Sequence, residues 1–253
     1  MRRMSKLAVM KTKTNVLLAV VALATAGAGY ACWPRTPHLR GFSPTDMGGL
    51  ETDMWRAYYD RHYAALIGCL YRVNRDDYGF SPLDSARVAY YAAKAAKIFQ
   101  PTTSRAEAQA ALPSLEAYFE LIRRRSHEPF DVASAARTEL DWWQLRREHV
   151  TFEDYGKVVA KVAAEVYRAS NQEIRRAGQL RAEMMDYRDQ RGDGRMKEAD
   201  WQHIRENLVE SYALLKKGVA RSEFDLRANL HDPVRGESEE VGGRAGIARK
   251  EAE

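Results

Sequence analysis

The helical pattern is clearest at residues 197–218, which read KEADWQHIRENLVESYALLKKG. At about 100° per residue, the apolar side chains of this stretch fall on one side of a helix and the charged ones on the other. The apolar stripe consists of Trp201, Ile204, Leu208, Tyr212 and Leu215. The stretch therefore predicts an amphipathic helix that buries one face and stops at Gly218.

The same periodicity recurs upstream, and most of the periodic segments follow a residue able to cap a helix. Pro113 lies inside one of them, where we expect a kink or a break. No strand-like alternation of useful length occurs, and the connections are short, so successive helices should pack antiparallel. The sequence predicts an all-α fold: an antiparallel helical bundle of about six to seven helices after an N-terminal membrane-targeting segment. The expected upstream helices are 51–73, Ser81 to near Pro101, Ser104 to about Arg125, Asp131 to about His149, one from Thr151, and Asn171 to Gly192.

Composition divides the chain into four parts. Residues 1–32 form the targeting segment, and residues 33–50, with three prolines and three glycines, are expected to be a tether. Residues 51–220 hold the helical domain. Residues 221–253 have scattered charges and little apolar periodicity, which predicts a disordered tail.

The N-terminal segment combines five cations with an uncharged run. Arg2, Arg3, Lys6, Lys11 and Lys13 precede residues 16–33, which read VLLAVVALATAGAGYACW. Three interpretations stay open: a cleaved signal peptide, an uncleaved anchor, or a lipoprotein modified at its cysteine. All three leave the cations in the cytoplasm and place the folded part outside it, in the cell envelope.

Two further expectations depend on this segment. Residues 1–31 contain no acid, so removing their five cations from the totals leaves 35 basic and 35 acidic residues. The basic balance therefore belongs to the leader, and nucleic acid is not an expected partner.

An exported location would permit a disulfide between Cys32 and Cys69, but Cys69 falls on an apolar helix face, which favours a buried free thiol.

Charged groups fall inside the apolar arcs of two expected helices. Glu139 and Arg146 lie among the apolar residues around Trp142 and Trp143, and Arg181 and Arg188 lie within the arc of helix 171–192. Buried charges must pair or reach water. We weigh three interpretations: a buried network in which Glu139 accepts a bidentate contact from Arg181 or Arg146, groups that in fact lie at the rim, or a pocket for an anionic or aromatic ligand.

One histidine also faces an apolar arc. His62 is surrounded on the wheel by Trp55, Leu66 and Cys69, which favours a hydrogen-bonded core residue over an acid–base group. The ligand-binding hypothesis therefore has seven candidate residues. They are His62, Glu139, Trp142, Trp143, Arg146, Arg181 and Arg188.

Sequence signatures of catalysis and of cofactors are absent. The six histidines form no HxxxH or HExxH pair, and the chain has no CxxCH, phosphate-binding glycine loop or GxSxG. We therefore expect no metal site and no cofactor, and we assign no catalytic residue. Two function classes remain. The first is a non-enzymatic binding module of the cell envelope, which meets the membrane through its N-terminal segment and binds a protein or a small anion. The alternative is an enzyme or small-ligand carrier that uses an Arg/Glu/Trp pocket between helices, with His62 as a possible acid–base group.

Overall fold

The computed structural model describes residues 18–33 and 35–231 of the chain, with side chains placed as far as residue 220. Within these residues the regular structure is helical and no strand occurs, so the all-α prediction is confirmed. After residues 18–32, which are helical, nine α-helices follow, more than the six to seven expected. They are α2 (Pro44–Tyr59), α3 (Tyr63–Arg72), α4 (Pro82–Phe99), α5 (Arg105–Ala108), α6 (Leu112–Ser126), α7 (Val132–Arg147), α8 (Phe152–Tyr167), α9 (Gln172–Arg191) and α10 (Glu198–His231).

Side-chain caps start four of these helices, α4, α5, α7 and α9, where the sequence places them. Ser81 Oγ accepts from the Asp84 backbone N–H at 3.1 Å. Asp131 does the same for α7, and Asn171 for α9. Each cap supplies an acceptor to a backbone N–H that the first turn of a helix leaves without an intrahelical partner. The predicted starts of these helices are confirmed, and so is the end of α9 at Gly192, where φ is +72°.

Two predicted helices are divided. The expected helix 51–73 is broken at Asp60–His62, where Arg61 adopts φ +59°, and a π-helical turn, Val73–Asp77, follows α3. The expected helix from Ser104 is broken before Pro113 by a 3-10 turn, because proline has no N–H to continue the ladder. These divisions account for the larger number of helices.

The tether prediction is wrong for residues 35–50. α2 begins at Pro44, with Ser43 as its cap, and Leu39 and Phe42 are buried in the core. The Tyr167 hydroxyl donates to the Leu39 carbonyl at 3.0 Å, which fixes the chain before the helix. Two large apolar side chains thus order a segment whose prolines and glycines had suggested a flexible connection.

The tail prediction is wrong for residues 221–231, because α10 continues to His231. Gly218 is helical and allows close packing: a Cβ there would lie 2.7 Å from Ile174 Cγ1. The sequence contains no proline between Gly218 and Pro233, so every residue in between can donate a backbone N–H to the helix. Residues 232–253 lie outside the described residues.

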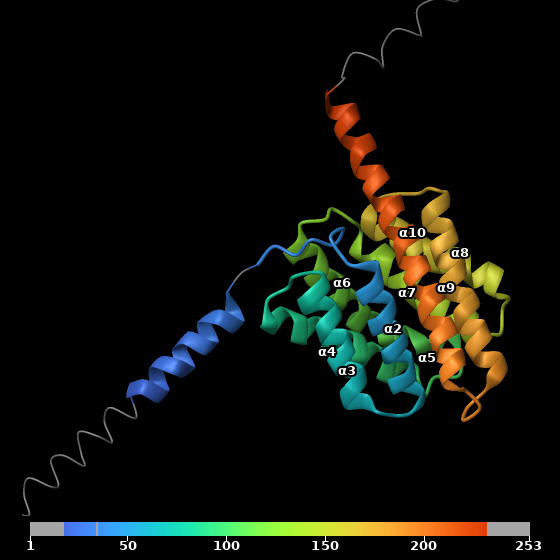
Figure 1. Ribbon diagram of the computed structural model, residues 1–253, viewed down its shortest axis with the longest axis horizontal. Helices are drawn as coiled ribbons and strands as arrows, with labels where there is room; N and C mark the ends of the chain where they lie inside the picture. The colour runs from blue at the N-terminus through green and yellow to red at the C-terminus, as the bar shows by residue number, and fades with distance from the viewer. Residues whose placement is uncertain (1–17, 34, 232–253) are drawn as a thin grey trace, which may run out of the picture.

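The helices pack as a bundle in which segments distant in sequence are neighbours. α10 crosses the body beside α2 and α9, α8 packs on α9, and α4 packs on α3 and α6 (Figure 1). Two glycines permit the closest approaches: a Cβ on Gly178 of α9 would meet the Ala160 backbone nitrogen at 2.5 Å, and one on Gly48 of α2 would meet that of Val209 at 2.6 Å. The bundle architecture is therefore confirmed.

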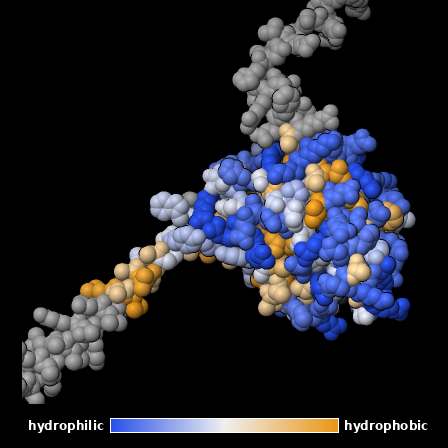
Figure 2. Space-filling view, in the orientation of Figure 1, coloured by the Kyte–Doolittle hydropathy of each residue, from blue (hydrophilic) through white to orange (hydrophobic). Residues whose placement is uncertain are grey.

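The N-terminal apolar helix stands apart from the body (Figures 1 and 2). Its side chains Leu18, Val20, Val21 and Leu23 are all exposed. Among the described residues, no helix has both the length and the apolar character needed to cross a bilayer. The expected segment begins at residue 16, outside that range, and the membrane-targeting prediction gains no support from the fold. Both cysteines are free, with Cys32 exposed and Cys69 half-buried.

Candidate functional site

An ion pair joins α2 to α9, between a buried acid and an arginine whose side chain is 27% exposed. Arg181 Nε donates to Oε1 of Glu51 at 2.6 Å, and Nη2 of the same guanidinium lies 2.5 Å from that oxygen. The second oxygen of Glu51 accepts from the Tyr212 hydroxyl of α10 at 2.6 Å. Glu51 is only 3% exposed, so both carboxylate oxygens are satisfied inside the protein. Burial opposes the charge on Arg181, but Glu51, Tyr212 and Glu139 together outweigh it and raise the arginine pKa.

Glu139 belongs to the same region but bonds within its own helix. Its Oε1 accepts from Trp143 Nε1 at 3.0 Å, one turn along α7. Burial raises the pKa of Glu139, although Trp142 and Arg181 favour the carboxylate. The Arg181 guanidinium also lies 5.7 Å from the centre of the Trp142 ring, within cation–π range. The buried Trp142 Nε1 makes no hydrogen bond of normal geometry.

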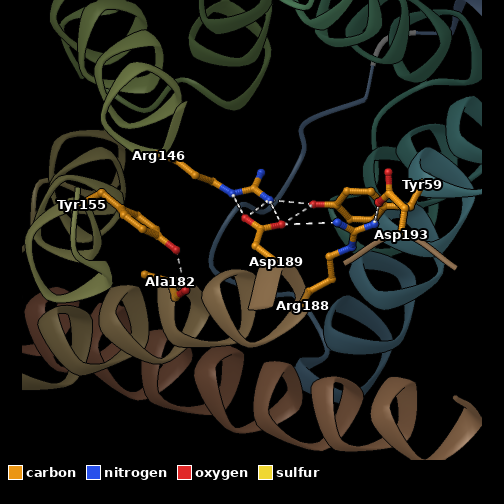
Figure 3. A network of polar contacts seen from close by, with 7 residues as sticks. All are labelled: Tyr59, Arg146, Tyr155, Ala182, Arg188, Asp189 and Asp193. Carbon is orange, nitrogen blue, oxygen red and sulfur yellow. Dashed lines mark hydrogen bonds and ion pairs between the residues drawn. The ribbon is translucent and has the colours of Figure 1, made fainter. Parts of the chain in front are cut away.

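A second network joins α2, α7 and the end of α9 (Figure 3). Arg146 Nη2 donates to the Tyr59 hydroxyl at 2.6 Å and to Asp189 Oδ2 at 2.8 Å. Arg188 pairs with Asp193 in the α9–α10 connection, and its guanidinium lies over the Tyr59 ring. Burial opposes the charge on Arg146, but Tyr59 and Asp189 reverse the effect and raise its pKa. The network attaches the α9–α10 connection to the ends of two other helices.

The expected pairing of Glu139 with Arg181 or Arg146 is therefore wrong, although Glu139, Trp142, Trp143 and Arg181 do lie together. Both arginines use other acids, because helix packing brings Glu51 and Asp189 closer to them. Arg188 is buried as expected, at 6% exposure.

The placement of His62 on an apolar core face is also wrong. It is an exposed residue at the N-terminus of α3, in the break between α2 and α3. The wheel assumed one continuous helix, and the break changes the angular position of every residue after Tyr59.

Glu51 is the central residue that the sequence reasoning missed. With the helix start placed at residue 51, Glu51 stood at the very beginning of the expected helix and was assigned no role. The signal that could have found it is Ser43-Pro44-Thr45-Asp46, the same pattern of residue types that opens α4 at Ser81-Pro82-Leu83-Asp84. Starting α2 there places Glu51 on the face of Met47, Leu50 and Trp55, all buried.

A pocket of about 340 Å³ lies elsewhere, between α5, α7 and α8. It includes none of the seven candidate residues. Three cationic side chains and one acid contribute to its wall: Arg105, Arg137, Lys161 and Asp141. Arg105 is bonded to Glu148 through Nε at 2.7 Å. Within the described part of the chain, no group of three or more His, Cys, Asp or Glu residues is arranged to hold a metal.

No protein-family model, curated protein or solved structure matches the chain.

Proposed function

We propose that this chain is a non-catalytic helical binding module, attached to a membrane through its N-terminal apolar segment, with its folded body outside the cytoplasm. The observation that carries the proposal is that the charged candidate residues interact with other groups of the same chain. Arg181, Arg146 and Arg188 each pair with an acid of the same chain, and Glu139 bonds to Trp143. Groups held in this way fix helix positions and leave few free atoms for a substrate.

The leader supports the location part of the proposal. Its five cations precede the apolar run, and membrane-inserted segments retain such cations on the cytoplasmic side. Beyond residue 33 most of the longer described helices combine buried apolar residues with exposed charged ones, as expected for a body in water. The interacting groups of such a module are those on its outer surface.

A reporter fusion tests the location. An enzyme active only in the cytoplasm, fused after Glu253, is expected to be silent with the native leader. The control fusion carries Val21→Asp and Leu23→Asp, which place charges in the apolar run, and should be active. Strong activity of the native fusion would overturn the proposal.

A second candidate function is the binding of a small anion in the pocket of α5, α7 and α8. Its support is the excess of cations there, and Arg137 makes no ion pair with another described residue. Titration with inorganic phosphate, followed by calorimetry, should give saturable heat that Arg137→Ala abolishes. The control Arg124→Ala, on exposed α6 surface, should leave it unchanged.

A further inference from the structure

The large apolar side chains exposed on the folded body come from three successive helices. Over residues 35–220, they are Tyr58 at the end of α2, Tyr63 and Ile67 of α3, and Tyr90 of α4. α3 reads YAALIGCLYR, yet none of its residues is fully buried. Such a helix normally covers a core with its apolar side chains. Figure 2 shows apolar surface at the lower edge of the body, where Figure 1 places α3.

This α3–α4 face, defined as the exposed surface of residues 63–72 and 82–99, is also cationic. Its basic residues are Arg72, Arg87, Lys94 and Lys97, and its one acid, Asp84, is buried against Arg125. Arg72 lies 3.8 Å from Asp76 and Arg87 lies 3.6 Å from Asp84, whereas Lys94 and Lys97 are exposed and supply the charge of the face. Tyr90, Lys94 and Lys97 follow at helical spacing on one side of α4, and the Lys94 ammonium lies 5.9 Å from the centre of the Tyr90 ring. Tyrosine mixed with lysine and arginine is the composition of protein surfaces at the lipid–water boundary.

The apolar N-terminal helix ends beside this face. The Tyr30 hydroxyl accepts from Arg75 Nη2 at 2.9 Å, in the π-helical turn that follows α3 directly. The guanidinium of Arg35, at the start of the folded body, lies 5.2 Å from the centre of the Tyr30 ring. A bilayer that receives residues 18–32 is therefore nearest to the end of α3.

We propose that the α3–α4 face lies against the headgroups of an anionic membrane. Its tyrosines and Ile67 enter the interfacial layer, and Lys94 and Lys97 contact the lipid phosphates. The anionic surface attracts the cations, and the apolar side chains hold the body flat against it. This inference rests on the proposed membrane attachment, which brings the face within reach of the lipid.

Hydrogen exchange on the full chain in vesicles tests the contact. The protein is reconstituted into phosphatidylcholine alone, or into equal parts phosphatidylcholine and phosphatidylglycerol, and flotation confirms its association. Amides of α3 and α4 are expected to exchange several-fold more slowly in the anionic vesicles than in the neutral ones. Amides of α8 should exchange equally in both.

Two charge-reversal variants sharpen the test. Lys94→Glu with Lys97→Glu should remove the protection in anionic vesicles. Arg175→Glu with Arg176→Glu makes the same charge change on α9, at two exposed side chains, and should keep it.

The outcomes separate this inference from the proposed function. A chain that does not float counts against membrane attachment itself. A chain that floats with equal exchange of α3 and α4 in both lipids overturns this inference alone. Protection that depends on protein density rather than on lipid charge would assign the face to a second copy of the chain and also overturn it.

Discussion

The substitution Glu51→Gln tests the central ion pair most directly. Gln retains the volume of Glu51 and can still accept from Tyr212, but it leaves the Arg181 guanidinium without its nearest anion. Removing one partner of a buried pair typically costs about 3–5 kcal/mol. Glu139 remains close enough to interact with Arg181, so we expect the lower end of that range, about 3 kcal/mol.

In a thermal melt this loss should be large. For a folded body of this size, each kcal/mol lowers the melting midpoint by about 2–4 °C, so Glu51→Gln should lower it by about 6–12 °C. Adding Arg181→Gln to Glu51→Gln should cost less than the sum of the two single changes, because they remove one interaction.

The matched control is Asp53→Asn, on the same helix. Asp53 pairs with Arg205 of α10 at 2.5 Å, but its side chain is 49% exposed. An exposed pair contributes at most about 1 kcal/mol. If Glu51→Gln destabilised the protein no more than Asp53→Asn, the central pair would not stabilise the bundle and the reasoning would be refuted.

Three further predictions concern other parts of the network and the packing. Burial raises the pKa of Glu139 above its ordinary 4.5, so its contribution to stability falls as pH rises from there through the folded pKa. As pH rises across that window, the urea unfolding midpoint of Glu139→Gln should rise relative to that of the wild type. A difference between the two midpoints that does not change with pH would contradict this. The Lys197 amide and other donors lower the pKa of Asp200 to about 2, so its stabilisation is present above 3.8 and lost as pH falls toward 2. Asp200→Asn should therefore melt lower at neutral pH and match the wild type near pH 2; equal melts at neutral pH would refute this. Gly178→Ala places a methyl against the Ala160 backbone and should cost about 1–3 kcal/mol by urea unfolding, whereas an unchanged midpoint would show that α8 and α9 can separate freely.

Local signals made most of the fold predictable. Helix starts at Ser81, Asp131 and Asn171 depend on a side chain and a backbone N–H three residues away, so the sequence alone contains the interaction. The start of α2 was missed although Ser43 accepts from the Asp46 N–H in the same way. Nearby prolines and glycines suggested a loop, and the burial that overrides them comes from contacts distant in sequence.

The candidate site was less predictable because its interactions are not local. Helical periodicity could identify Glu139 and Arg181 as charges in apolar surroundings, and the structure places both at partly buried positions between the helices. Periodicity could not choose their partners. Glu51 is 130 residues from Arg181 in sequence, and the two meet because α2 and α9 both pack beside α10.

The pairing found in the structure has a consequence for the surface. Glu51 bonds to Arg181 of α9 and Tyr212 of α10, so α2 can slide along neither helix without separating a buried charge from its partner. α3 follows α2 after a three-residue break and packs on it. The position of the exposed Tyr63 and Ile67 is therefore fixed through α2 by the buried pair. Loosening that pair should therefore disturb the proposed membrane-facing surface as well as the core.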